Sequence, residues 1–138
     1  METARNQVII DTDILVDMLR GLEKAVKFIA DLEQKGITLS TTVINAFELY
    51  YGAYKSKNKL NNLTAANKLL ERMVTLKMTL RSAERAGQIH AELEAKGQQI
   101  GIRDIIIGAI ALTKGYPLIT RNTAHLQKIQ GLNLMAAP

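Results

Sequence analysis

Short apolar runs alternate along the chain with longer segments in which apolar residues recur every three or four positions. Runs of the first kind are typical of buried strands, and segments of the second kind are typical of helices that cover a sheet. This alternation predicts an α/β protein with helices between successive strands. Strands are predicted at residues 8–10, 37–39, 74–76 and 118–120, with a fifth at 132–135.

The helical segments end at residues that favour helix capping or termination. Gly36, Gly97 and Gly115 each follow a segment with one apolar face, as a glycine after the last helical turn commonly does. Thr79 is a typical N-cap residue ahead of the long central helix, and Asp104 is one ahead of the most apolar helix. Ser40 or Thr41 would cap the second helix. Helices are predicted at residues 22–35, 42–53, 60–73, 80–96 and 105–113.

Length and composition limit the classes of protein that this chain can be. It has 138 residues, of which 47% are hydrophobic and 22% are charged, so residues 1–138 are expected to form one globular domain. The longest segment without a charged residue, 36–47, is too short for a membrane span, and no apolar signal segment opens the chain. The absence of Cys excludes disulfides and thiolate metal sites. We therefore expect a cytoplasmic protein without membrane contact.

The net charge of +5 is concentrated in one region. Residues 51–85 contain eight Lys or Arg and two Glu, a net charge of +6. A local basic region is typical of proteins that bind a polyanion such as RNA. A solvated helix surface in a basic protein would give the same pattern, so both interpretations stay open.

Three carboxylates stand where a parallel sheet would bring them to one edge. Asp11 directly follows the first strand, and Asp104 begins the most apolar helix. Glu48 lies within a predicted helix between Phe47 and Leu49, where a carboxylate needs a partner. Open parallel sheets bind ligands at the carboxyl ends of their strands, so we expect the three acids to converge there. Such a cluster needs a cation, and carboxylate oxygens favour Mg²⁺ or Mn²⁺.

Four segments resemble the signature segments of the PIN-domain family, in the family's order and across nearly the whole chain. They are VIIDTDILVD at 8–17, FELYYGA at 47–53, DIIIGAIAL at 104–112 and LITRNTAHL at 118–126. The length and the cysteine-free composition resemble the VapC-type toxins of toxin–antitoxin pairs. The resemblance implies a three-layer α/β/α sandwich with a central, mostly parallel sheet of four to five strands.

The resemblance also implies roles for individual residues. It assigns metal-binding and catalytic roles to three acids, Asp11, Glu48 and Asp104. At the fourth position Asn122 stands where several members have Asp, and it can coordinate a metal without adding charge. His125 stands where many members have an acid. Asp13 stands where the family often has Asn or Ser, and it would restore the lost negative charge.

The activity that the resemblance implies is endonucleolytic hydrolysis of RNA phosphodiester bonds. A bound Mg²⁺ or Mn²⁺ would polarise the phosphate and lower the pKa of a bound water. Arg103 and Arg121 flank the expected site as phosphate ligands, although an ordinary surface position is the favoured interpretation of Arg103. Thr12 is either a hydroxyl of the metal site or, as we favour, an N-cap. A cognate antitoxin protein and a homodimer are also implied.

Two other functions fit parts of the sequence. Asp11 and Asp13 after a strand resemble the first motif of Mg-dependent phosphatases of the haloacid-dehalogenase type, but Asp104 has no second acid nearby and the chain is short for that fold. A non-catalytic module that binds RNA or protein through residues 51–85 would leave Glu48 unexplained.

Three aromatic residues share one face of a predicted helix. Phe47, Tyr50 and Tyr54 follow one another at helical spacing. Stacking on RNA bases would suit them. We favour core packing or a dimer interface, which such a stripe more often forms.

Overall fold

A five-stranded parallel sheet runs through the centre of the computed structural model, which describes residues 6–138. The strands lie in the order β3-β2-β1-β4-β5, and each neighbouring pair is parallel. The predicted single domain also includes residues 1–5, which lie outside the described part. The strands are β1 (Gln7–Ile10), β2 (Thr38–Thr42), β3 (Val74–Leu76), β4 (Leu118–Thr120) and β5 (Leu134–Ala136).

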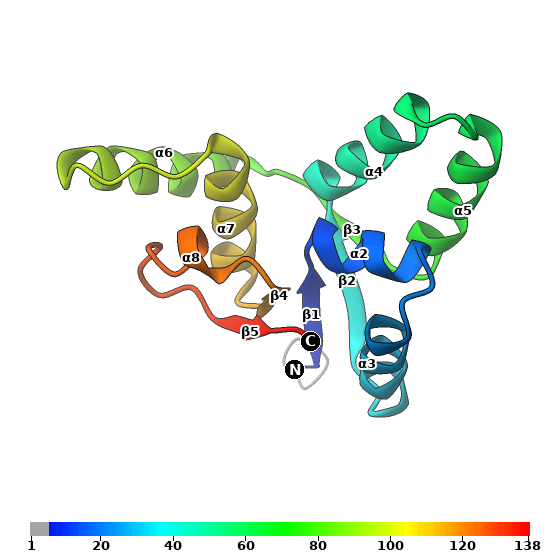
Figure 1. Cartoon of the computed structure of the whole chain (residues 1–138). Coiled ribbons are helices and arrows are strands. Elements are labelled where there is room, and N and C mark those ends of the chain that lie inside the picture. The colour runs from blue at the N-terminus through cyan, green and yellow to red at the C-terminus, as the bar shows by residue number, and fades with distance from the viewer. Residues whose placement is uncertain (1–5) are drawn as a thin grey trace.

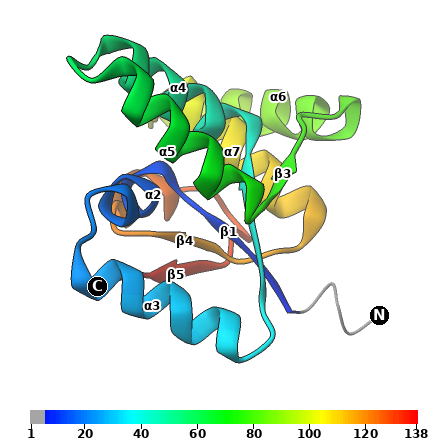
Figure 2. The ribbon, with the colours of Figure 1, turned by 90° about the vertical axis from the view of Figure 1, so that its right-hand side faces the viewer.

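Helices cover both faces of this sheet, which gives the predicted three-layer α/β/α arrangement (Figures 1 and 2). One face carries α2 (Thr12–Leu19), α3 (Glu23–Gln34), α4 (Val43–Lys55) and α5 (Lys59–Glu71). The other face carries α6 (Leu80–Ala95), α7 (Ile102–Lys114) and α8 (Thr123–Leu126). None of the helices within residues 6–138 is long and apolar enough to cross a membrane.

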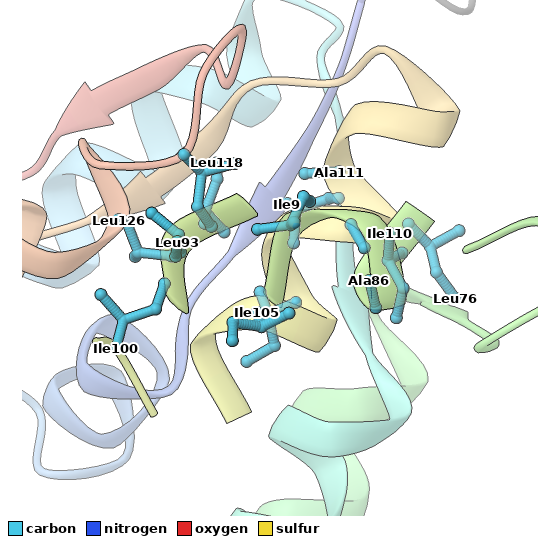
Figure 3. Close-up of a cluster of buried hydrophobic side chains, with 14 residues drawn as sticks. Ile9, Leu76, Ala86, Leu93, Ile100, Ile105, Ile110, Ala111, Leu118 and Leu126 are labelled. Atoms are coloured by element: carbon cyan, nitrogen blue, oxygen red, sulfur yellow. The ribbon is translucent and has the colours of Figure 1, made fainter. Parts of the chain in front are cut away.

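The central strands have apolar side chains on both faces because both faces are covered. Successive residues of a strand point to opposite sides, so Ile9 joins the core under α6 and α7 while Val8 and Ile10 join the core under α2 to α5. Leu118 and Ile119 on β4 divide in the same way. Figure 3 shows the first of these cores, in which Ile9 and Leu118 contribute from the sheet.

The carboxyl end of β2 is polar but fully buried, and it differs from the prediction. Thr41 and Thr42 belong to the strand, and Thr42 rather than Ser40 or Thr41 caps α4. Its hydroxyl accepts from the backbone N–H of Asn45, whose side-chain oxygen in turn accepts from the Thr42 N–H. This capping box fixes the start of α4 next to the end of β1.

Two other helix starts near that edge also differ from the prediction. Asp11, not Thr12, is the N-cap of α2, because its carboxylate accepts from the Thr12 N–H at 2.8 Å. Gly101, not Asp104, is the N-cap of α7, which places Asp104 within the first turn of the helix. In Figure 1 the upper end of β1 therefore faces the starts of α2, α4 and α7.

Of the aromatic stripe on α4, Phe47 and Tyr54 lie outside the core, whereas Tyr50 packs against it. Phe47 and Tyr54 are 65% and 61% exposed, so the core interpretation is wrong for both. Tyr50 is half-buried, and its hydroxyl donates to Asn67 at 2.6 Å. Phe47 stacks on Tyr51, which is itself exposed, with 6.4 Å between the ring centroids.

Candidate active site

Three acids from three different helices meet at the carboxyl end of β1. Asp11 comes from the N-terminus of α2, Glu48 from α4 and Asp104 from the first turn of α7. The side chains of Asp11 and Asp104 are 3% and 9% exposed, and that of Glu48 is 29% exposed. The sheet thus brings together carboxylates that are separated by up to 93 positions in the sequence.

One guanidinium group lies between the three carboxylates. Arg103 Nη1 donates to Asp104 Oδ1 at 2.6 Å, and Nη2 donates to Asp11 Oδ1 at 2.8 Å. Nη2 and Nε donate to the two oxygens of Glu48, each at 2.8 Å. The interpretation of Arg103 as a surface residue is therefore wrong. We call these four residues the Arg103 cluster.

Uncharged hydrogen-bond donors hold Asp11 in place. Its Oδ1 accepts from Asn45 Nδ2 at 3.0 Å, and its Oδ2 accepts from Thr120 Oγ1 at 2.9 Å. Asn45 is completely buried and was not predicted to belong to the site. The signal for it was an amide in a predicted helix among apolar residues, where a buried polar group must find partners.

Thr12 connects two of the site's elements. Its hydroxyl donates to Glu48 Oε1 at 2.5 Å and accepts from Asn45 Nδ2 at 2.8 Å. Because Asp11 is the N-cap, the favoured N-cap interpretation of Thr12 is wrong. The Thr12 hydroxyl instead links the acid on α4 to the start of α2.

The hydrogen bonds keep Glu48 ionised. Burial by itself would raise the pKa of Glu48, but the bonds from Arg103 and Thr12 and the charge of the guanidinium together lower it below its ordinary value. The bond to Glu48 is the main reason that the pKa of Arg103 is raised. Counting each of the three acids as −1 and the arginine as +1, the Arg103 cluster has a formal charge of −2.

A second arginine lies nearby with two other acids. Arg121 Nη1 is 2.8 Å from Asp17 Oδ2, and Nε is 3.9 Å from Asp13 Oδ2. Asp13 also accepts from the Arg121 backbone N–H at 3.0 Å and from the Thr120 hydroxyl at 3.3 Å. We call Arg121, Asp13 and Asp17 the Arg121 cluster. It fastens the end of β4 to α2, with Thr120 between the two clusters.

The two residues at the variable fourth position lie on the exposed side of the site. Asn122 is exposed and precedes α8 without a side-chain capping bond, and its backbone N–H donates to Thr120 Oγ1 at 3.1 Å. His125 Nδ1 is 3.8 Å from Asp104 Oδ2, and its side chain is 53% exposed. Of the two, His125 has the contact with the Arg103 cluster.

The donor chemistry of the Arg103 cluster fits a hard divalent cation, since all its acidic groups are carboxylates that face one point. Within residues 6–138, no three Asp, Glu or His side chains lie as close together as a metal ion requires. The guanidinium of Arg103 occupies the space between the acids. The residues therefore fit a metal ion in kind, provided that Arg103 leaves this position.

Comparison with known proteins identifies relatives over nearly the whole chain. The family model of the PIN domain matches residues 8–132. The tRNA(fMet)-specific endonuclease VapC of Shigella flexneri is 29% identical over 123 residues, which cover 89% of this chain and 92% of that protein. Ribonuclease VapC2 of Haemophilus influenzae is 28% identical over the same shares of the two chains.

Solved structures agree with these sequence matches. One chain of the VapBC2 structure from Rickettsia felis, which was solved with a DNA fragment from the VapBC2 promoter, superposes with a TM-score of 0.88 at 26% identity. The match covers 96% of this chain and 99% of that one. A toxin–antitoxin complex from Klebsiella pneumoniae gives a TM-score of 0.70 at 26% identity, covering 91% and 94%.

Proposed function

The chain belongs to the PIN-domain family, and on that premise we propose that it is a metal-dependent endoribonuclease, the toxin of a toxin–antitoxin pair. It hydrolyses RNA phosphodiester bonds. The observation that carries this proposal is the convergence of Asp11, Glu48 and Asp104 on one cation position at the carboxyl edge of the sheet. VapC ribonucleases that align with nine-tenths of the chain support the same activity.

The three acids would hold Mg²⁺ or Mn²⁺. When bound, such an ion would polarise the scissile phosphate and lower the pKa of a water molecule that it binds. Asn45 and Thr120 orient the Asp11 carboxylate through one hydrogen bond each. Thr12 does the same for Glu48. Such outer hydrogen bonds fix the direction of the ligand oxygens.

The remaining predicted residues are proposed to act on the substrate side. His125 lies beside Asp104, and Asn122 is on the same exposed segment, so both would face RNA bound at the acids. Arg121 is 45% exposed and would contact a backbone phosphate. Asp13 shares the Thr120 hydroxyl with Asp11 and adds negative charge next to the site.

Two protein partners are also proposed. A groove lined by α2, α4 and α5 opens beside Glu48, with Leu19 and Ala53 among its apolar lining, and it would receive a segment of the cognate antitoxin. The toxin–antitoxin complex from K. pneumoniae supports such a partner. The exposed pair Phe47 and Tyr51 would join a second copy of the chain in a homodimer.

Membership of the PIN-domain family argues against the alternative function as a phosphatase of the haloacid-dehalogenase type. In that alternative Asp13 would be a general acid, whereas its carboxylate accepts from the Arg121 N–H and lies within hydrogen-bond distance of the Thr120 hydroxyl. The non-catalytic alternative is separated from the proposal by experiment.

The test is cleavage of total RNA by the purified chain, with Mn²⁺ or Mg²⁺ in one set of reactions and EDTA in the other. Asp11→Asn, purified in the same way, controls for a contaminating nuclease. We expect discrete products that disappear with EDTA and with the variant. Products that persist with EDTA or with Asp11→Asn would contradict the proposal, and RNA binding without cleavage under every condition would favour the non-catalytic module.

A further inference from the structure

The cation position of the active site is taken by a side chain of the protein itself. Arg103 uses Nε, Nη1 and Nη2 to reach all three acids, at distances between 2.6 and 2.8 Å. These are short, charge-assisted hydrogen bonds, and two of them engage both oxygens of Glu48. The guanidinium therefore binds the three acids through specific, directed hydrogen bonds.

The electrostatic setting explains why a cation is held there. Asp11 and Asp104 are nearly buried, and two ionised carboxylates so close to a third repel one another unless a positive group lies between them. Among the ion pairs within residues 6–138, Arg103 is the sole basic partner of Asp11 and Glu48. Arg103 thus supplies a positive charge at the point where the three carboxylates meet.

A guanidinium and a divalent cation cannot share this space. Mg²⁺ holds its oxygen ligands at about 2.1 Å, whereas the acids here lie 2.6 to 2.8 Å from the nitrogens of a flat group that is several ångströms wide. Metal binding requires the carboxylates to move inward and the guanidinium to leave. The two cations therefore compete for the same oxygens.

We propose that Arg103 is a built-in competitor of the divalent cation and that it sets the metal affinity of the active site. This inference rests on the proposed function, since it presumes that the acids bind a metal. Every metal-binding event then includes the displacement of Arg103. The affinity measured for the whole protein is lower than that of the same three acids without the guanidinium, by the cost of breaking its contacts.

The direct test is calorimetric titration of the full, EDTA-treated and dialysed chain with Mn²⁺ at neutral pH. Arg103→Gln removes the charge but keeps an amide that can donate to a carboxylate, and we expect it to bind Mn²⁺ at least about tenfold more tightly than the wild type. Arg103→Lys keeps the charge on one nitrogen, which cannot reach all three acids, so its affinity should lie between the two.

Arg121→Gln is the matched control. It removes the same charge from the neighbouring cluster, where Arg121 pairs with Asp17 and Asp13. If Arg103 acts through its contacts and not through net charge, Arg121→Gln changes the Mn²⁺ affinity by less than about threefold. A tenfold gain in both variants would overturn the inference.

The outcomes separate this inference from the proposed function. Mn²⁺ binding to Arg103→Gln that is equal to or weaker than binding to the wild type overturns the competition and leaves the ribonuclease proposal standing. No Mn²⁺ binding by either protein overturns the metal site and the inference with it. Should Arg103→Gln not fold, Arg103→Lys decides, because an affinity no higher than that of the wild type contradicts competition by the guanidinium.

Discussion

Two arginines gather carboxylates at the same edge of the sheet, but in different proportions. In the Arg103 cluster one guanidinium contacts three acids at 2.6 to 2.8 Å. In the Arg121 cluster one guanidinium is 2.8 Å from Asp17 and 3.9 Å from Asp13. The formal charges are −2 and −1, and the side chain of Arg103 is less exposed, at 33% against 45%.

The difference between the clusters indicates which one carries the chemistry. A fold that needed only stability would not gather three carboxylates, two of them nearly buried, around one positive charge, because the surplus acids repel each other. The Arg103 cluster contains this repulsion, and its acids accept hydrogen bonds from the side chains of Asn45, Thr12 and Thr120. A surplus of fixed negative charge prepares a site for a cation, whereas the Arg121 cluster joins two elements of the fold.

The largest expected effect comes from exchanging one buried acid in each cluster. Asp104 and Asp17 are a matched pair, since their side chains are 9% and 7% exposed and each contacts an arginine Nη1, at 2.6 and 2.8 Å. Asp104→Asn should lower the rate of metal-dependent RNA cleavage by more than about 100-fold, above the usual cost of losing an outer hydrogen bond to a metal ligand. Asp17→Asn should lower it by less than about fivefold.

Cleavage rates measured under the same metal concentration, with folded protein quantified by circular dichroism, check this prediction. Equal losses in the two variants would mean that the clusters do not differ in function. A loss confined to Asp17→Asn would move the active site to the Arg121 cluster.

The next effect concerns the uncharged groups around the acids. Asn45→Ala removes the amide that donates to Asp11 and to Thr12, so we expect a loss of about 10- to 100-fold in Mn²⁺ affinity or cleavage rate. Asn67→Ala is the control, because Asn67 is exposed and accepts only from Tyr50 among the side-chain bonds described for residues 6–138. Titration with Mn²⁺ and cleavage assays measure both, and similar values for the two variants would contradict the orienting role of Asn45.

The hydrophobic pattern predicted most of the fold because the buried strands and long helices have clear periodicity. Strands at 8–10, 74–76 and 118–120 are confirmed within a residue. The polar end of β2 was assigned to a helix cap, since Ser and Thr favour caps and nothing local reveals that they are buried. Helices α2 and α8 were missed because they are short, and α8 has only four residues.

The acids of the site could be predicted, but their partners could not. Asp11, Glu48 and Asp104 follow strand ends or lie in apolar helical segments, and the sequence shows both features. The sequence gives no such signal for Arg103. The direction of a long side chain in the first turn of a helix depends on which groups the rest of the fold places around it. Asp17 has Arg20 three residues away, yet it pairs with Arg121, which directly follows β4.

Stability should follow the opposite order to activity. Asp17→Asn leaves Arg121 with Asp13 at 3.9 Å as its remaining acid, so we expect a loss of about 1 kcal/mol in the free energy of unfolding, or roughly 4 °C in Tm. Asp104→Asn leaves Arg103 with two acids and relieves the repulsion between carboxylates. Without metal, the free energy of unfolding of this variant should therefore be within about 0.5 kcal/mol of the wild-type value or higher than it. Thermal melts in EDTA decide, and a larger loss for Asp104→Asn would contradict the distinction.

The smallest expected effect is a dependence on pH that belongs to the Arg103 cluster. The pKa of Glu48 is lowered from 4.5, because its bonds from Arg103 and Thr12 outweigh the effect of burial. Ionised Glu48 therefore stabilises the fold above pH 4.5, and this contribution is lost as the pH falls through the lowered pKa. In EDTA, the wild type should lose stability relative to Glu48→Gln between about pH 5 and pH 3.

Glu33→Gln breaks an exposed pair with Arg72, which is worth at most about 1 kcal/mol, and serves as the control. A stability difference between wild type and Glu48→Gln that stays constant over this range would mean that Arg103 does not hold the Glu48 carboxylate in solution.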